Sequence, residues 1–394
     1  MTADEMSARL EELTEADSPI TYGVVKPGEP GEVLFIRGGD IADGSVLDKQ
    51  LRTITCKTSQ QYKRTRLRGG ELLICLVGQP GQVAVAPLSL KGANIARQVG
   101  LIRLRREINA EFISYFLQSP EGQARLGTHT GGSVQQVINL GDLRTIIVPT
   151  PPASEQQRIV TLLDEAFDGI AKARANAEKN LQNARALFES HLQSVFTERG
   201  HGWVEKRLGD VCAITSTLVD PRIEGFSDLT HVGAGNIEPR KGTFVELKTA
   251  REEGLISGKF LFDESMVLYS KIRPYLMKVA RPNFNGLCSA DMYPLTPRPN
   301  EITRDYLFHL LLSKSFTDYA IMGSARAGMP KVNREHLFEF RTWLPDVERQ
   351  NELSAQLDMS HEETQRLESI YKKKLAALDE LKQSLLHQAF SGQL

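Results

Sequence analysis

Cysteine is scarce in this sequence, which has four among 394 residues, at Cys56, Cys75, Cys212 and Cys288. Because no two of them form a Cys-x-x-Cys pair, the spacing argues against a zinc site and a disulfide framework, and we expect buried, reduced thiols. A run of eighteen apolar residues is lacking too, and Met1–Met6 has neither the basic region nor the apolar core of a signal peptide. These absences predict a cytoplasmic protein with no membrane partner.

An excess of either charge is also lacking, since 48 Lys and Arg residues face 49 Asp and Glu residues. This balance argues against a protein that coats DNA through bulk positive charge, so any basic groups that bind nucleic acid must be arranged locally. The chain is 41% hydrophobic and 25% charged, which is ordinary globular composition. Its length predicts two or three folded units.

What the sequence does contain is an internal repeat, with an offset of about 194 positions. The segment Ile108–Ser119 parallels Ile302–Ser313. The pattern Pro152-x-x-Glu155-x-Gln157 recurs as Pro345-x-x-Glu348-x-Gln350, and Ser190–Phe196 recurs as Ser384–Phe390, with a one-residue indel between these two matches. The chain is therefore expected to be two copies of a domain followed by a helix.

Each domain half contains short apolar runs bounded by Gly and Pro, as strands are. In the first half these runs are Leu72–Val77, Val83–Ala86, Val99–Leu104 and Ile146–Val148. The segments Glu111–Leu117 and Arg304–Leu312 have helical spacing of apolar residues. We therefore expect an α+β protein with two similar mixed α/β domains.

A long helix is expected after each domain. Apolar residues alternate in steps of four and three with a single slip, which is the seam of a coiled coil, at Ile159, Leu163, Ala166, Ile170, Ala173, Ala177, Leu181, Ala184, Phe188, His191 and Val195. The second copy supplies a stripe at Leu353, Leu357, Leu367, Ile370, Leu375, Leu378, Leu381 and Leu385. Because an internal repeat favours a pseudo-two-fold axis, we expect the two helices to pair antiparallel, and a rod of about 65 Å would then separate the two domains.

The chain strongly resembles the specificity subunit of type I restriction-modification systems. Four features carry the resemblance together: the Pro-x-x-Glu-x-Gln helix start, a long helix that ends near Phe-Ser-Gly, the repeat over both halves, and the stretch Ser270–Tyr275 (Ser-Lys-Ile-Arg-Pro-Tyr). The resemblance covers essentially the whole chain. It implies a DNA sequence-specificity subunit that recognises a bipartite double-stranded DNA target, with one half-site for each target-recognition domain. The predicted divisions are an N-terminal extension at 1–20, domain 1 at 21–150, a central helix at 151–199, domain 2 at 200–344 and a C-terminal helix at 345–394.

The resemblance also implies partners. Methyltransferase subunits, expected to be two, would dock on the helices and bind S-adenosylmethionine, and a restriction and translocation subunit would complete the complex. The chain itself is then expected to hold no cofactor and no metal and to be no enzyme. The acidic start before Thr21 has no clear counterpart in the second copy.

Candidate DNA-contacting residues in the first domain begin with the tract Tyr62–Arg68, which sets four cations beside one aromatic residue and suits phosphate contacts. Lys63 and Arg64 are the favoured pair, against the alternative of a solvated strand edge. Gln79 lies in an expected turn, where glutamine pairs bidentately with adenine. The set also includes Arg37, Arg97, Ser133 and Gln135, the last two from a Gly-rich loop that allows close approach to a phosphate.

In the second domain, Met266–Arg281 contains four basic residues and no acidic one, with tyrosines interleaved. Arg273 precedes a proline in a turn at the position that we match to Gln79, so its guanidinium is expected to reach a guanine edge or a phosphate. The alternative is simple divergence of a turn. The set in this domain is Lys271, Arg273, Tyr275, Lys278, Arg326 and Lys331, the last two from a second Gly-rich loop.

Other functions find less support in the sequence. The main alternative is a coiled-coil scaffold whose repeated domains bind proteins without DNA specificity. Asp228 and Glu246-Leu-Lys248 imitate the acids and lysine of a metal-dependent nuclease, but such tripeptides are common. The chain lacks an Asn-Pro-Pro-aromatic element and a Gly-rich cofactor loop for methyl transfer, and His191 is expected to pack in the helix seam rather than to bind metal.

Overall fold

The computed structural model describes residues 6–47, 49–127, 130–131, 137–324 and 329–393. The chain forms two compact units, residues 1–178 with 373–394 and residues 179–372. Two long helices, α5 (Ala153–Thr197) and α10 (Val347–Phe390), each contribute to both units. The rest of each unit is a mixed α/β domain, which confirms the α+β fold class with an internal repeat.

The first domain is built around the four-stranded sheet β2–β10–β7–β8, with a second sheet β6–β3–β9 and the pairs β1–β13, β4–β5 and β11–β12. Its strands are β1 Ser7–Arg9, β2 Thr21–Tyr22, β3 Val33–Ile36, β4 Ile41–Ala42, β5 Ser45–Val46, β6 Arg52–Ile54, β7 Leu72–Cys75, β8 Val83–Val85, β9 Asn94–Ile95, β10 Val99–Ile102, β11 Thr130–Gly131, β12 Val137–Ile138 and β13 Ile147–Pro149. Its helices are α1 Cys56–Gln61, α2 Ala110–Gln118, α3 Pro120–Gly127 and α4 Leu140–Thr145. All four predicted strand segments and the predicted α2 are confirmed.

The second domain repeats the central sheet as β15–β23–β20–β21 and adds the five-stranded sheet β16–β19–β22–β17–β18 and the pair β14–β24. Its strands are β14 Val204–Arg207, β15 Cys212–Ala213, β16 Leu218–Val219, β17 Thr230–Val232, β18 Lys248–Thr249, β19 Lys259–Phe262, β20 Val267–Ser270, β21 Val279–Ala280, β22 Gly286–Cys288, β23 Met292–Pro297 and β24 Arg341–Leu344. Its helices are α6 Leu208–Val211, α7 Arg304–Leu312, α8 Lys314–Met322 and α9 Arg334–Phe338. The predicted helix Arg304–Leu312 is confirmed.

The two long helices run antiparallel within each unit. In the first unit, Lys382 of α10 lies over the Phe167 ring and Arg174 pairs with Asp379, so higher numbers on one helix face lower numbers on the other. The second unit shows the same order, since Arg185 pairs with Glu368 and Phe188 lies beside His361. The buried seam of α5 includes Ile159, Leu163, Ala177, Ala184, Phe188 and Val195, as the spacing predicts.

The predicted apolar stripe of α10 is partly wrong. Ile370 and Leu381 are 45% and 47% exposed, whereas Leu386 and Ala389 are buried. Leucine spacing alone did not separate the seam from the outer face of α10, because apolar residues occur on both faces. The thiols also differ from expectation at one position, since Cys75, Cys212 and Cys288 are buried but Cys56 is exposed.

The prediction that residues 1–20 form a separate N-terminal extension is wrong for the residues from Ser7 to Leu13. Strand β1 pairs with β13, and Leu10 and Leu13 are 0% and 2% exposed in the core of the first domain. The second domain has the counterpart that the sequence did not reveal, because β14 pairs with β24 and Leu208 N donates to Phe340 O as Leu10 N donates to Ile146 O. The acidic start is therefore part of the repeat.

The contacts at the start of each long helix show that the proline motifs of the two copies were aligned one residue out of register. Gln156 and Gln350 are 2% and 0% exposed, and their Oε1 atoms accept the backbone N–H of Asn109 and Thr303 at 2.9 and 2.8 Å. Their Nε2 atoms donate to Pro151 O and Pro345 O. The structural equivalents are thus Pro151 with Pro345 and Gln156 with Gln350, so the inferred indel is removed.

Candidate nucleic-acid interface

The loop between β20 and β21 carries the basic turn of the second domain. Ser270 N donates to Lys278 O at 3.0 Å, which closes the loop, and Arg273 N donates to Pro330 O at 2.9 Å. Arg273 and Met277 have φ values of 49° and 51°, in the left-handed region that non-glycine residues rarely adopt. Arg273 is exposed, so this backbone presents its guanidinium to solvent.

A second loop brings Lys331 beside this turn. Ile272 forms a β-bridge with Lys331, and Val332 N donates to Lys271 O at 2.8 Å. The ammonium groups of Lys331 and Lys271 lie 3.4 and 3.7 Å from Asp291 Oδ1. Burial and the nearby Lys331 lower the pKa of Lys271. The structure therefore gathers Lys271 and Lys331 around one carboxylate, next to the turn that carries Arg273.

The other two candidates from this loop have different surroundings. Lys278 Nζ donates to the backbone carbonyl of Ala234, and burial followed by the nearby Arg273 lowers the pKa of Lys278. The half-buried Lys278 therefore donates a hydrogen bond within the domain. Tyr275 is 49% exposed. An exposed aromatic ring beside a cationic turn suits contact with a nucleotide.

The first domain has an equivalent loop between β7 and β8, which contains Gln79. Ile138 N donates to Leu76 O at 2.9 Å, and Val77 forms a β-bridge with Val137. A second loop thus returns beside Gln79, as the Lys331 loop returns beside Arg273. Gln79 is exposed.

Arg37 and Arg97 lie at the same end of this sheet. A Cβ on Gly38 would come within 3.1 Å of Val77 O, which places the Arg37 loop against the Gln79 loop. Arg37 forms a two-pronged ion pair with Asp40, at 2.8 and 3.1 Å, which raises the pKa of Arg37. Arg97 is exposed just before β10.

Lys63 and Arg64 lie elsewhere in the first domain. Arg103, which follows the last residue of β10, donates to Arg64 O at 2.9 Å, whereas the Gln79 loop lies by the first residue of β10. The sheet therefore separates this pair from Gln79 and Arg37. Of the remaining candidates, Ser133, Gln135 and Arg326 lie outside the described residues.

Strand register corrects the match between Gln79 and Arg273. Cys75 pairs with Val99 as Ser270 pairs with Met292, so Cys75 and Ser270 are equivalent. Counting three residues onward from this equivalent pair places Gly78, not Gln79, with Arg273. The loop of the second domain is also one residue longer than that of the first. The two loops differ in length as well as in their polar side chains.

Two further polar residues, Asp291 and Gln98, lie at this end of the two central sheets and are not basic. Asp291 and Gln98 are equivalent, since their backbone carbonyls accept N–H groups from Lys271 and Leu76 at 3.1 and 2.7 Å. An aspartate accepts a hydrogen bond from the cytosine amino group, and a glutamine pairs with adenine. The sequence signal that could have identified them is their position just before a central strand, β10 or β23, and not their charge.

The nuclease-like acids form a different arrangement. Asp228 Oδ1 lies 2.8 Å from Arg251 Nε, and this ion pair lowers the pKa of Asp228. Within the described residues, His, Cys, Asp and Glu form no group of three that could hold a metal ion. No helix in that same part of the chain is long and apolar enough to cross a membrane.

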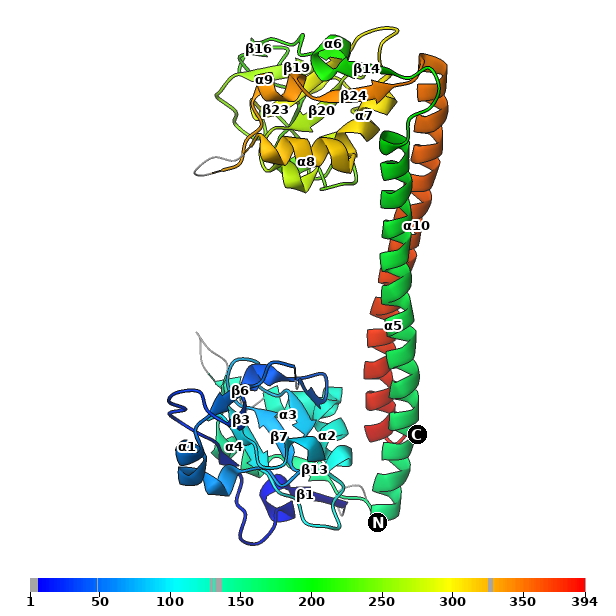
Figure 1. The fold of residues 1–394 in the computed structure, drawn as a ribbon. Coiled ribbons are helices and arrows are strands. Elements are labelled where there is room, and N and C mark those ends of the chain that lie inside the picture. The colour runs from blue at the N-terminus through cyan, green and yellow to red at the C-terminus, as the bar shows by residue number, and fades with distance from the viewer. Residues whose placement is uncertain (1–5, 48, 128–129, 132–136, 325–328, 394) are drawn as a thin grey trace. The chain divides into compact units, whose positions relative to one another are not determined.

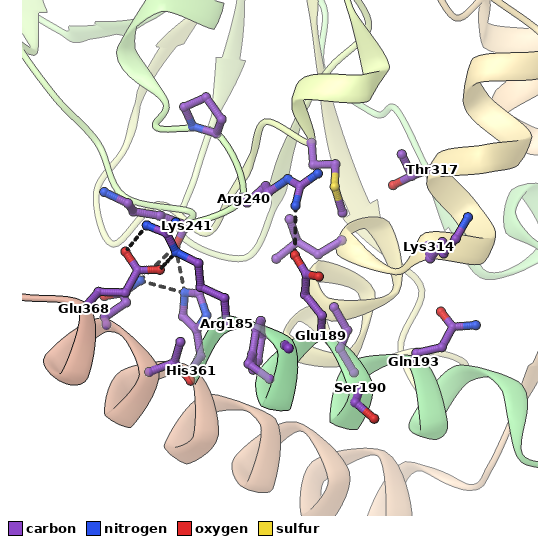
Figure 2. Close-up of a pocket in the computed structure, with 18 of the residues that line it drawn as sticks. Arg185, Glu189, Ser190, Gln193, Arg240, Lys241, Lys314, Thr317, His361 and Glu368 are labelled. Carbon is purple, nitrogen blue, oxygen red and sulfur yellow. Dashed lines mark hydrogen bonds and ion pairs between the residues drawn. The ribbon is translucent and has the colours of Figure 1, made fainter. Parts of the chain in front are cut away.

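A cavity of about 840 Å³ lies in the second unit between its domain and the paired helices. Figure 2 shows Arg240 extending toward Glu189 of α5 and Arg185 beside Glu368 of α10. The five Lys and Arg residues in its lining all have an acidic partner, at Arg185, Arg240, Lys241, Lys314 and Lys372. The cavity is therefore a seam between domain and helices rather than a free cationic site.

The family model described as the type I restriction modification DNA specificity domain matches residues 7–179 and again 200–375. The chain belongs to this family. The two matches coincide with the two copies of the repeat, each of which contains a mixed α/β domain and a long helix.

Curated relatives agree with this assignment. The chain is 29% identical to the EcoDI specificity subunit of Escherichia coli over 321 residues, which is 73% of this chain and 70% of the relative. It is 32% identical to the E. coli EcoBI specificity subunit over 49% of this chain and 40% of that protein.

Solved structures share the fold. One, from a study of complex assembly and conformational transition of the type I R-M system, has a TM-score of 0.74 at 18% identity and covers 98% of both chains. The HsdS subunit of Thermoanaerobacter tengcongensis has a TM-score of 0.58 at 19% identity, covering 98% of this chain and 97% of that one.

In a specificity subunit, Arg273→Ala is expected to weaken discrimination in the second half-site by about 1–3 kcal/mol if the guanidinium makes a bidentate contact with guanine. The measurement is binding to duplexes that vary one base pair at a time. Arg349→Ala, which removes an exposed arginine paired with Glu352 on α10, is the matched control. An equal loss on every sequence would assign Arg273 to a phosphate instead.

Proposed function

We propose that this chain reads a bipartite double-stranded DNA target, with the Arg273 loop and the Gln79 loop facing the two half-sites. The observation that carries the proposal is the repeated pair of loops at the end of each central sheet, which bear different polar side chains in the two domains. Different groups on equivalent scaffolds are what two different half-sites require. The scaffold alternative offers no reason for this difference.

The chain is proposed to act without chemistry of its own. Methyl transfer would belong to methyltransferase subunits, two for each specificity subunit, which bind S-adenosylmethionine. Cleavage and translocation would belong to a restriction subunit. The EcoDI and EcoBI relatives are specificity subunits of type I restriction enzymes, which supports assembly with such partners.

The test compares the purified chain with the chain assembled with its methyltransferase subunits, each given S-adenosylmethionine, magnesium and mixed duplex DNA. We expect methyl incorporation only from the complex, and only in duplexes that carry both half-sites at one spacing. Labelled methyl transfer by the chain alone would refute a non-catalytic subunit. Methylation that ignores sequence would favour the protein-binding scaffold.

A further inference from the structure

The same contact joins each recognition domain to a long helix in its own unit. In the first unit, Tyr115 Oη of α2 donates to Asp164 Oδ1 of α5 at 2.5 Å. In the second unit, His309 Nε2 of α7 lies 2.8 Å from Asp358 Oδ1 of α10. Both pairs occupy equivalent positions of the repeat. In each unit, a side chain from a helix of the domain therefore contacts the equivalent aspartate of a long helix.

The second unit adds an arginine to this contact. Arg281, which follows β21, donates to both oxygens of Asp358 at 2.7 and 3.0 Å and to Asp305 at 2.8 Å. Its guanidinium also lies 4.2 Å from the centre of the Phe308 ring. Asp358 therefore receives charge-assisted hydrogen bonds from two different segments of the recognition domain.

Burial and hydrogen bonding together fix the geometry of this cluster. The His309 side chain is fully buried, and burial lowers its pKa although the hydrogen bond to Asp358 acts in the opposite direction. Because a carboxylate oxygen can only accept, Nε2 of His309 donates to Asp358. Burial would raise the pKa of Asp358, but the hydrogen bonds from His309 and Arg281 hold it below its usual range. Apolar packing of α7 on α10 permits sliding, whereas a fork of hydrogen bonds fixes one geometry. In Figure 1, α7 lies between β20 and α10, where this contact forms.

A second contact holds the same domain further along the helices. Arg240 Nη1 lies 2.8 Å from Glu189 Oε1 of α5, and His361 Nε2 of α10 lies 3.0 Å from the carbonyl of Lys241 (Figure 2). The matching hairpin in the first unit has a longer contact, between Lys382 Nζ and Asp43 O at 3.5 Å. Among the residues that the structure describes, this hairpin of the second domain therefore makes shorter contacts with the helices than its counterpart in the first domain.

We propose that Asp358, His309 and Arg281, the Asp358 latch, are positioning residues that set the angle of the second recognition domain on the helices and thereby restrict the spacer length of the DNA target. The inference rests on the proposed bipartite recognition. The latch touches no DNA itself: it restricts the DNA geometry that the Arg273 loop can reach. Loss of the latch is expected to relax spacer selectivity without changing the bases that are read.

The test measures methylation by the assembled complex on duplexes whose two half-sites are separated by the preferred spacer or by one base pair more or less. His309→Leu removes the donor at similar volume and is expected to reduce the preference for the correct spacer roughly fivefold to tenfold, which lies within the range for loss of one intramolecular hydrogen bond. His309→Gln keeps an N–H donor and is expected to restore the preference. Tyr115→Phe, which removes the equivalent hydrogen bond to Asp164 in the first unit, should have a smaller effect.

Tyr306→Phe is the matched control on α7, because Tyr306 is fully buried and the change leaves Asp358 and His309 intact. Thermal unfolding of each variant separates loss of folding from loss of positioning. A folded His309→Leu complex with the spacer preference of the parent protein would overturn the latch. Altered base discrimination at an unchanged spacer preference would also overturn it. If the parent complex shows no spacer preference, the bipartite function fails instead.

Discussion

Replacing Gln350 with leucine is expected to lower the free energy of unfolding of the second unit by about 3 kcal/mol. The Gln350 side chain is fully buried and bonds to three backbone groups, Thr303 N at 2.8 Å, Pro345 O at 2.9 Å and Glu301 O at 3.0 Å. Leucine removes all three bonds and leaves the backbone groups unpaired in the interior, which costs about 1–3 kcal/mol for each unsatisfied group before relaxation. Chemical unfolding followed by circular dichroism measures the change.

Neighbouring glutamines of the first unit give a matched pair for this prediction. Gln156→Leu removes two buried hydrogen bonds and is expected to cost about 2 kcal/mol. Gln157→Leu removes only exposed contacts, with Asn109 Nδ2 at 3.2 Å and with Thr161 Oγ1 at 3.4 Å, and is expected to cost less than about 0.5 kcal/mol. Equal effects at the two positions would show that the buried glutamine does not tie the domain to its helix.

Lengthening both long helices by four residues is expected to change the preferred DNA spacer while both half-sites stay the same. The insertions are placed near Asn176 in α5 and after Ala377 in α10, which are both in the first unit and on antiparallel helices. Four residues add about 6 Å of helix and a rotation of roughly 40° beyond one turn. Since B-DNA rises about 3.4 Å per base pair, the favoured spacer should lengthen by about two base pairs.

Methylation of a library of duplexes that differ only in spacer length measures this shift. The control inserts the same four residues at His201, in the connection between α5 and β14, where no helix is lengthened. The preferred spacer should not change in that variant. An unchanged spacer in a folded and active double insertion would show that helix length does not determine target spacing.

Local periodicity carried most of the fold prediction. The apolar steps from Ile159 to Val195 predicted α5, because a helix needs only neighbours three and four residues away. Strand β1 was missed since its pairing with β13 spans nearly the whole first domain, and nothing local in Ser7–Arg9 announces that partner. The shift from Gln157 to Gln156 has a similar cause: the two residues differ in burial, which the linear pattern does not record.

The candidate interface was predicted in part for the same reason. Turn residues and local charge indicated the Arg273 loop, and the structure places Lys331, which was predicted separately from a distant loop, beside it. Charge alone also selected Lys63 and Arg64, which the central sheet separates from Gln79. Asp291 was missed because an acidic group is not an obvious DNA contact until its position between two lysines is known.

The first unit is discontinuous in sequence, and this affects how the protein can be made on the ribosome. Phe390 packs against the rings of Phe112 and Phe116 at 5.3 and 5.4 Å, and Leu386 is buried in the same core. These residues follow the second unit in the chain, whereas the second unit, residues 179–372, is one uninterrupted segment. During synthesis the second unit can therefore fold before the first is complete, which reverses the usual N-terminal-first order. The nascent first domain lacks the packing of Phe390 on Phe112 and Phe116 until Phe390 has been translated.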